Sequence, residues 1–127
     1  MKTIISTTKA PSAIGPYNQA TAFDKLIFTS GQIALDPTTM EIVSGGVQEQ
    51  TKQVMENLKA VLEEAGSSFE NVLKTTCYLS DMDNFVAFNE IYAQYFKGET
   101  APARSTVAVK TLPKNVLVEV DTIAFKN

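Results

Sequence analysis

The chain has 127 residues, of which 44% are hydrophobic and 20% are charged, and its formal net charge is −3. These values are typical of a single soluble globular domain, which we expect to span residues 1–127, and the acidic balance argues against a basic surface for nucleic acid. The absence of histidine and the presence of one cysteine exclude a Ser-His-Asp triad, a Cys-His dyad, a zinc site with histidine ligands and an intrachain disulfide.

The sequence carries no sign of export or of membrane insertion. No apolar run approaches the ~20 residues that a membrane-spanning helix needs. The first residues, Met1–Ser6, lack the long apolar segment of a signal peptide. The lone Cys77 fits a reducing compartment, so we expect a cytoplasmic location and a small, buried core thiol.

The first part of the chain predicts three strands and one tight turn. The strand-like runs are Lys2–Ser6, Tyr17–Phe23 and Leu26–Ile33. The last two are separated by Asp24-Lys25, which predicts a two-residue hairpin. Gly31 falls near the end of the third run, where a glycine either marks a bulge or turn or lets a ligand approach the backbone.

Two later segments have the apolar spacing of amphipathic helices. Val47–Ala65 places its charged residues largely outside one apolar stripe, and Gly66 follows as a stop. A second helix begins after a cap at Asp81 or Asp83 and runs to about Lys97. The two stripes consist of Val54, Met55, Leu58, Val61, Leu62 and Ala65, and of Phe85, Phe88, Tyr92, Tyr95 and Phe96.

Asn89 falls on the apolar stripe of the second predicted helix. A buried amide needs hydrogen-bond partners, because leaving it unpaired costs about 1–3 kcal/mol. A neighbouring backbone group is one partner that could satisfy it.

Three further strands complete the predicted fold. Phe69–Leu79 contains one of them, in which Leu73 and Cys77 share a face. The other two, Arg104–Val109 and Val116–Phe125, are predicted to form an antiparallel pair. The order β-β-β-α-β-α-β-β predicts an α+β two-layer sandwich, in which two helices cover one face of a mixed sheet.

Arg104 stands at the start of a predicted strand, directly after a segment that Pro102 keeps from being helical. Alternation places Arg104, Thr106 and Ala108 on one face of that strand. A guanidinium at this position can hold a carboxylate through two parallel hydrogen bonds. The alternative is an ordinary solvated arginine, because charged side chains usually lie at the surface.

The last predicted strand carries two carboxylates, Glu119 and Asp121, on one face. Both cannot be buried without partners, so this face meets either solvent or a polar site. Two helices can cover only one face of the sheet. Because the strand that follows Arg104 is apolar on both faces, we expect the second face to contact another subunit.

Five short motifs occur in a fixed order along most of the length of the chain. They are Ala13-Ile14-Gly15-Pro16-Tyr17-Asn18-Gln19, Ser30-Gly31-Gln32-Ile33, Pro102-Ala103-Arg104-Ser105, Leu112-Pro113-Lys114 and Val118-Glu119-Val120. Together they resemble the signature of the reactive intermediate deaminase A family, also called RidA or YjgF. Each motif alone would be weak, but their order and intervals from about Lys9 to Phe125 make the resemblance specific.

The resemblance implies a chorismate-mutase-like version of the α+β sandwich and a homotrimer with sites in clefts between neighbouring subunits. The family hydrolyses reactive 2-enamino and 2-imino acids, such as 2-iminobutanoate and 2-iminopropanoate, to 2-keto acids and ammonia. The implied partner is therefore a small-molecule substrate. We expect no cofactor, no metal and no membrane contact.

The resemblance also implies roles for seven residues. Arg104 would hold the substrate carboxylate, Glu119 would orient and deprotonate the attacking water, and Tyr17 would line the cleft. The substrate-binding residues would be Ser30, Gly31, Asn89 and Thr106. Many family members carry cysteine where this chain has Thr106, so a covalent thiol mechanism at that position is excluded here.

Two functions of other classes stay open at this point. The chain could be a non-catalytic regulator that binds small carboxylates in the same cleft. It could also be a translation inhibitor that acts on RNA, an activity ascribed to relatives, although the net charge of −3 counts against it.

Overall fold

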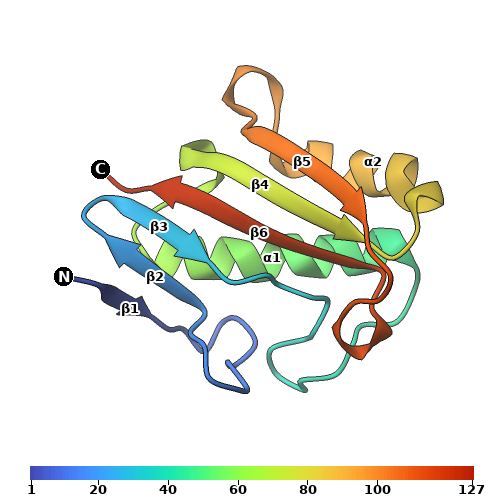
Figure 1. Cartoon of the computed structure of the whole chain (residues 1–127), viewed down its shortest axis with the longest axis horizontal. Helices are drawn as coiled ribbons and strands as arrows, with labels where there is room; N and C mark the ends of the chain where they lie inside the picture. The colour runs from blue at the N-terminus through green and yellow to red at the C-terminus, as the bar shows by residue number, and fades with distance from the viewer.

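Six strands form one mixed sheet, and two helices cover one of its faces (Figure 1). The computed structural model describes the whole chain, Met1–Asn127. The elements are β1 (Thr3–Ile5), β2 (Ala20–Phe23), β3 (Leu26–Thr29), α1 (Val47–Glu64), β4 (Val72–Leu79), α2 (Phe85–Tyr95), β5 (Ala103–Ala108) and β6 (Val118–Phe125). Across the sheet the strands follow the order β1-β2-β3-β6-β4-β5. The predicted α+β sandwich and its order of elements are confirmed.

The predicted hairpin at Asp24-Lys25 joins β2 and β3 as antiparallel neighbours. Asp24 has a φ of 56°, the left-handed conformation that two-residue hairpin turns require. The strand before the turn is shorter than predicted, because it begins at Ala20 and leaves Tyr17 in the preceding loop. Pro16, at the start of that loop segment, has no N–H to offer to a strand ladder.

β3 ends at Thr29 instead of the predicted Ile33, and the chain then leaves the ladder. It returns at Gln32, which exchanges two backbone hydrogen bonds with Val120 of β6, at N···O distances of 2.9 and 3.2 Å. The intervening Ser30-Gly31 segment lies beside β6 outside regular pairing. A side chain of β6 or a ligand can therefore approach its backbone.

β6 lies in the middle of the sheet, between β3 and β4. The prediction that Arg104–Val109 and Val116–Phe125 form an antiparallel pair is therefore wrong. β5 pairs with β4 in parallel and forms an edge of the sheet. The connection through α2 returns the chain to the end of the sheet where β4 began, and a helical crossover of this kind joins parallel strands.

A bulge near the start of β4 turns one side chain away from its predicted face. Val72 and Lys74 lie opposite adjacent residues of β6, so Leu73 is an extra residue in the ladder. Leu73 keeps 47% of its surface exposed, whereas Val72 and Cys77 are buried. The prediction that Leu73 shares a face with Cys77 is therefore wrong, and the predicted burial of Cys77 is confirmed.

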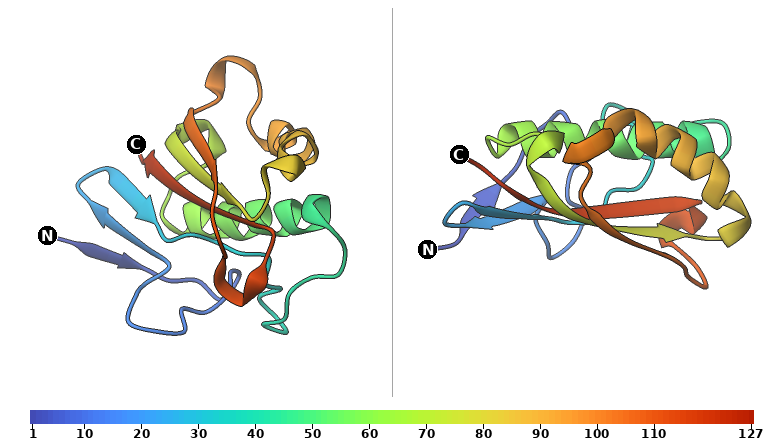
Figure 2. Two further views of the ribbon diagram at one scale, coloured as in Figure 1. Left: turned by 45° about the vertical axis from the view of Figure 1, so that its right-hand side comes forward. Right: turned by 90° about the horizontal axis from the view of Figure 1, so that it is seen from above.

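Both helices pack on the same side of the sheet (Figure 2). The apolar stripe predicted for α1 is buried along its whole length. α2 begins at Phe85, later than predicted, because Asp81 caps a short 3-10 turn, Met82–Asn84, ahead of it. The Asp81 carboxylate accepts a hydrogen bond from the N–H of Asp83 at 2.8 Å. No helix combines the length and the apolar character of a membrane span.

The opposite face of the sheet has no covering layer and is partly apolar. Leu26, Phe28 and Val107 belong to this face, and each keeps 41–44% of its surface exposed. Glu119 and Asp121 lie on the same face and are half-buried. Contact of this face with another subunit, which the sequence predicts, stays a prediction.

Candidate functional site

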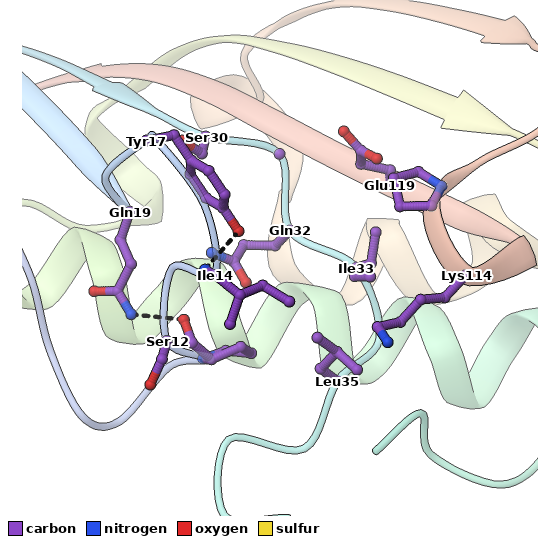
Figure 3. A pocket seen from close by; sticks show the side chains of 13 residues that line it. Ser12, Ile14, Tyr17, Gln19, Ser30, Gln32, Ile33, Leu35, Lys114 and Glu119 are labelled. Carbon is purple, nitrogen blue, oxygen red and sulfur yellow. Dashed lines mark hydrogen bonds between the residues drawn. The ribbon is translucent and has the colours of Figure 1, made fainter. Parts of the chain in front are cut away.

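A cavity of about 490 Å³ opens beside the sheet where β3 ends (Figure 3). Its wall consists of the loop before β2, the segment after β3, the turn before β6 and one side chain of β6. Four of the seven predicted site residues line this cavity, namely Tyr17, Ser30, Gly31 and Glu119. The other three, Asn89, Arg104 and Thr106, lie elsewhere on the chain.

The Glu119 side chain lies directly over the backbone of Gly31. A Cβ atom at Gly31 would come within 2.8 Å of the Cδ atom of Glu119, closer than real Cβ contacts allow. A side chain at position 31 would therefore displace the Glu119 carboxylate, and glycine leaves room for it. Of the two alternatives left by the sequence, this observation favours a backbone that another group approaches.

Burial raises the pKa of the Glu119 carboxyl, and the negative charge of Asp121 raises it further. Burial also raises the pKa of Asp121, although two neighbours oppose this effect. The Tyr78 hydroxyl donates a hydrogen bond to Asp121 at 3.1 Å, and Lys74 supplies positive charge. Glu119 is therefore a stronger base than an exposed glutamate.

Tyr17 and Ser30 present hydroxyl groups in the cavity wall (Figure 3). The Tyr17 hydroxyl accepts a weak hydrogen bond from the N–H of Ile14 at 3.5 Å and keeps its own hydrogen to donate. The Ser30 hydroxyl donates to the carbonyl of Asn18 at 2.6 Å and can still accept. These two hydroxyls thus add one free donor and one free acceptor to the cavity wall.

Gln19 holds the loop that forms one wall of the cavity, a role that the sequence analysis did not assign. Its buried amide accepts from the N–H of Thr7 at 2.7 Å. It also donates to the carbonyls of Thr7 at 3.0 Å and Pro11 at 2.7 Å. Its place in the first motif, between a proline-containing loop and a strand, is the signal that could have indicated it.

Lys114 also lines the cavity without having been predicted as a site residue. Lys114 and Asn115 both have a φ of 55°, which is uncommon for residues with a side chain. Such conformations cost about 1–3 kcal/mol each and gather at functional sites. The signal in the sequence is Pro113 followed by Lys114 and by an asparagine, a residue that tolerates this conformation.

Arg104 lies on the edge strand β5, apart from the cavity, and contacts α2. Its Nη1 group donates to Oδ1 of Asn89 at 2.7 Å. Its guanidinium carbon lies 4.7 Å from the ring centre of Tyr92 and 5.4 Å from that of Phe85. Arg104 is therefore held in place although it is exposed, and the partner of Asn89 is this side chain instead of a neighbouring backbone group.

Thr106 lies two residues beyond Arg104, opposite Cys77 of β4. Its Oγ1 is the one buried side-chain oxygen or nitrogen of the chain without a hydrogen-bond partner. Burial raises the pKa of the Cys77 thiol to about 11, so Cys77 stays protonated at neutral pH. The Thr106 hydroxyl lies beside this thiol and is itself buried.

The seven predicted residues form two groups on opposite sides of the sheet. Arg104 lies opposite Thr75, which is buried beneath the helices, whereas Glu119 lies opposite Tyr78 on the uncovered face. β4 also separates the two strands that carry them. A single copy of the chain therefore does not bring Arg104 and Glu119 onto one small molecule.

Known proteins share this architecture over its full length. The family model described as Endoribonuclease L-PSP matches residues 7–126. A RutC family protein of Synechocystis is 59% identical over 122 residues, which cover 95% of this chain and 94% of that protein. The mouse protein named 2-iminobutanoate/2-iminopropanoate deaminase is 49% identical over 126 residues, or 99% and 93% of the two chains. Among solved structures, Escherichia coli TdcF with bound serine has a TM-score of 0.92 and 42% identity, covering 98% of this chain and 99% of that one.

These relatives share one class of fold, a two-layer α+β sandwich in which both helices lie on one face of a mixed sheet. The family model and the identities extend across the loop, sheet and turn that form the cavity. The chain belongs to the RidA/YjgF family, as its motifs predict.

Proposed function

We propose that the chain is a deaminase that hydrolyses small 2-imino and 2-enamino acids to 2-keto acids and ammonia. The observation that carries this proposal is the Glu119 carboxylate, which lies over the Gly31 backbone in a cavity and has a raised pKa. A carboxylate held in this way can take a proton from water at neutral pH. The name of the mouse relative, 2-iminobutanoate/2-iminopropanoate deaminase, supports this substrate class.

The proposed enzyme is a homotrimer in which neighbouring copies share each site. Arg104 and Glu119 project from opposite faces of the sheet. One copy therefore supplies Arg104, which binds the carboxylate, and a neighbouring copy supplies the base Glu119. The exposed Leu26, Phe28 and Val107 support association, because an apolar sheet face is more stable when another surface covers it. The serine bound to TdcF carries an α-carboxylate, which supports a small acid as the ligand.

In the proposed mechanism, Arg104 of one copy holds the substrate carboxylate with two parallel hydrogen bonds. The enamine takes up a proton on carbon and loses one from nitrogen, which gives the imine. Glu119 of the next copy accepts a proton from water, the water oxygen attacks the C=N carbon, and the nitrogen gains a proton. The C–N bond of the resulting carbinolamine then breaks. The nitrogen takes a second proton and leaves as ammonia, and the hydroxyl loses its proton to give the keto acid.

The other predicted residues would position the substrate. Thr106 and Asn89 lie beside Arg104, and Tyr17 and Ser30 line the same cavity as Glu119. Imines already hydrolyse in water, so holding the C=N carbon next to an oriented water supplies much of the acceleration.

A coupled assay tests the proposal. Threonine dehydratase generates the four-carbon enamine and imine, and their decay is followed by ultraviolet absorbance with and without the protein. We expect the decay rate to rise in proportion to protein concentration, and Glu119→Gln to give little acceleration. An unchanged decay rate would contradict the deaminase, and serine binding without turnover would then favour a carboxylate-binding regulator.

RNA cleavage is the second candidate, because the matching family model is described as Endoribonuclease L-PSP. The chain has no histidine to act as a general acid or base and a net charge of −3, so we expect no cleavage. Incubation with labelled RNA at low and physiological salt tests this expectation. Cleavage that disappears in Glu119→Gln would assign nuclease activity to the same cavity.

A further inference from the structure

One face of α2 forms a socket for the Arg104 guanidinium, made of Phe85, Asn89 and Tyr92. These residues are spaced i, i+4 and i+7, so they project from the same side of the helix. Asn89 accepts a hydrogen bond from Nη1 of Arg104 at 2.7 Å, and the two rings lie 4.7 and 5.4 Å from its central carbon. The socket therefore contacts Arg104 through one hydrogen bond and two aromatic faces.

Tyr92 is the better fixed of the two rings. It is 7% exposed, and its hydroxyl shares a 2.8 Å hydrogen bond with the buried hydroxyl of Thr75. Its ring also packs against Phe88 and Phe96, at centroid distances of 5.5 and 4.8 Å. The ring plane that Arg104 contacts is therefore set by the core and not by Arg104 itself.

A guanidinium over a fixed ring has fewer orientations than a free arginine side chain. An arginine has five N–H donors, and Asn89 engages one of them, so the others remain for a ligand. When an arginine is already held in place, less conformational entropy is lost as a carboxylate binds to it. The binding free energy is then more favourable.

We propose that Tyr92 is a positioning residue, whose ring fixes the plane of Arg104 so that the remaining N–H groups face the substrate carboxylate. This role rests on the proposed function for the nature of that carboxylate. Tyr92 itself does not touch the substrate.

Calorimetric titration with 2-oxobutanoate tests the role, with 2-oxobutanamide as the uncharged probe. Tyr92→Leu removes the ring and should weaken 2-oxobutanoate binding about tenfold, the size of the cost of ordering one flexible side chain on binding. Tyr92→Phe keeps the ring and loses only the Thr75 bond, so we expect a loss of about threefold or less. Binding of the amide should be the same in all three proteins.

Ile27→Val is the control, because Ile27 is fully buried on β3, which β6 and β4 separate from the strand that carries Arg104. It should lower stability and leave 2-oxobutanoate affinity within about twofold. If Tyr92→Leu does not fold, Phe85→Leu replaces it, with an expected loss of about threefold, since that ring is farther from Arg104.

Four results would overturn the positioning role. They are no 2-oxobutanoate binding by the wild type, equal losses in Tyr92→Phe and Tyr92→Leu, equal losses for keto acid and amide, and an Ile27→Val loss as large as that of Tyr92→Leu. The binding assay needs no turnover. A protein that fails the coupled assay but shows ring-dependent carboxylate binding would therefore contradict the deaminase and retain the role of Tyr92.

Discussion

Glu119 and Asp121 lie two residues apart on the same face of β6, and the negative charge of Asp121 raises the pKa of Glu119. Asp121 has Tyr78 and Lys74 to stabilise its charge. At Glu119, burial and repulsion act in the same direction and raise the pKa. Glu119, whose pKa no neighbour lowers, is thus the carboxylate that lines the cavity.

The pH dependence of turnover should report this raised pKa. Only the ionised form of Glu119 accepts a proton from water, so the turnover number should fall as pH decreases through that pKa. The fall should begin above the range of an ordinary glutamate, whose pKa is about 4.3. Rates measured between pH 4 and pH 8, about the span that brackets this transition, check the expectation.

Two variants show whether Glu119 or another titrating group causes the fall in turnover at low pH. Glu119→Gln should lower the turnover number about 100-fold and remove the acidic limb of the profile. Asp121→Asn should keep turnover and move the limb to lower pH, because it removes the charge that raises the Glu119 pKa. An acidic limb that survives in Glu119→Gln would assign the proton transfer to another group.

Arg104→Lys tests whether the site needs a planar guanidinium or only positive charge. Lysine offers a single flexible ammonium in place of a fork with two parallel donors. We expect kcat/KM for a 2-imino acid to fall about 100-fold, equivalent to roughly 3 kcal/mol of transition-state stabilisation. Steady-state kinetics on the imino acid and on its uncharged amide provide the measurement. Equal losses for both substrates would show that Arg104 does not bind the carboxylate.

Within β4, the bulge decides which side chains belong to the core. Cys77→Ala truncates a fully buried residue and should cost roughly 1 kcal/mol of unfolding free energy while most turnover is kept. Leu73→Ala removes more atoms, but Leu73 is exposed, so the cost should stay below about 0.5 kcal/mol. Urea denaturation of both variants shows whether Cys77→Ala loses more unfolding free energy than Leu73→Ala. Loss of activity in a folded Cys77→Ala would mean that the thiol takes part in the reaction.

The elements that the sequence predicted well are those that depend on local pattern. The hairpin at Asp24-Lys25 follows from two strand-like runs and a short gap, and α1 follows from its apolar stripe. The partner of β5 depends on a contact through the α2 crossover, which alternation along one strand does not encode. The bulge at Leu73 is one inserted residue, and it shifts the alternation without any glycine or proline to mark it.

The candidate site, like the fold, was predicted only in part. The motifs selected residues that the structure places in two compact groups, around Glu119 and around Arg104. The two groups lie on opposite faces of the sheet. This arrangement depends on the order of the strands, and the sequence predicted the wrong neighbour for β5. The contact between Arg104 and Tyr92 joins two residues that the sequence assigned separately, one to a site and one to a core stripe.

For the whole molecule, the uncovered sheet face predicts self-association. Sedimentation equilibrium at micromolar concentration should give the mass of a trimer. Phe28→Asp places a charge on that face and should shift the mass toward the monomer and reduce turnover, since each site needs two copies. Val86→Asp is the control, because Val86 is exposed on α2, on the other side of the sheet, and should change neither. A monomeric wild type with full turnover would contradict the shared site.

The central position of β6 has a consequence for the order of folding during synthesis. β6 is the last strand to leave the ribosome, yet β3 and β4 both pair with it. The two halves of the sheet therefore cannot join until β6 has left the ribosome. Until then β3 and β4 present open strand edges that can pair with other nascent chains. A message truncated before the codon for Val118 would make this exposed state permanent and yield an aggregating product.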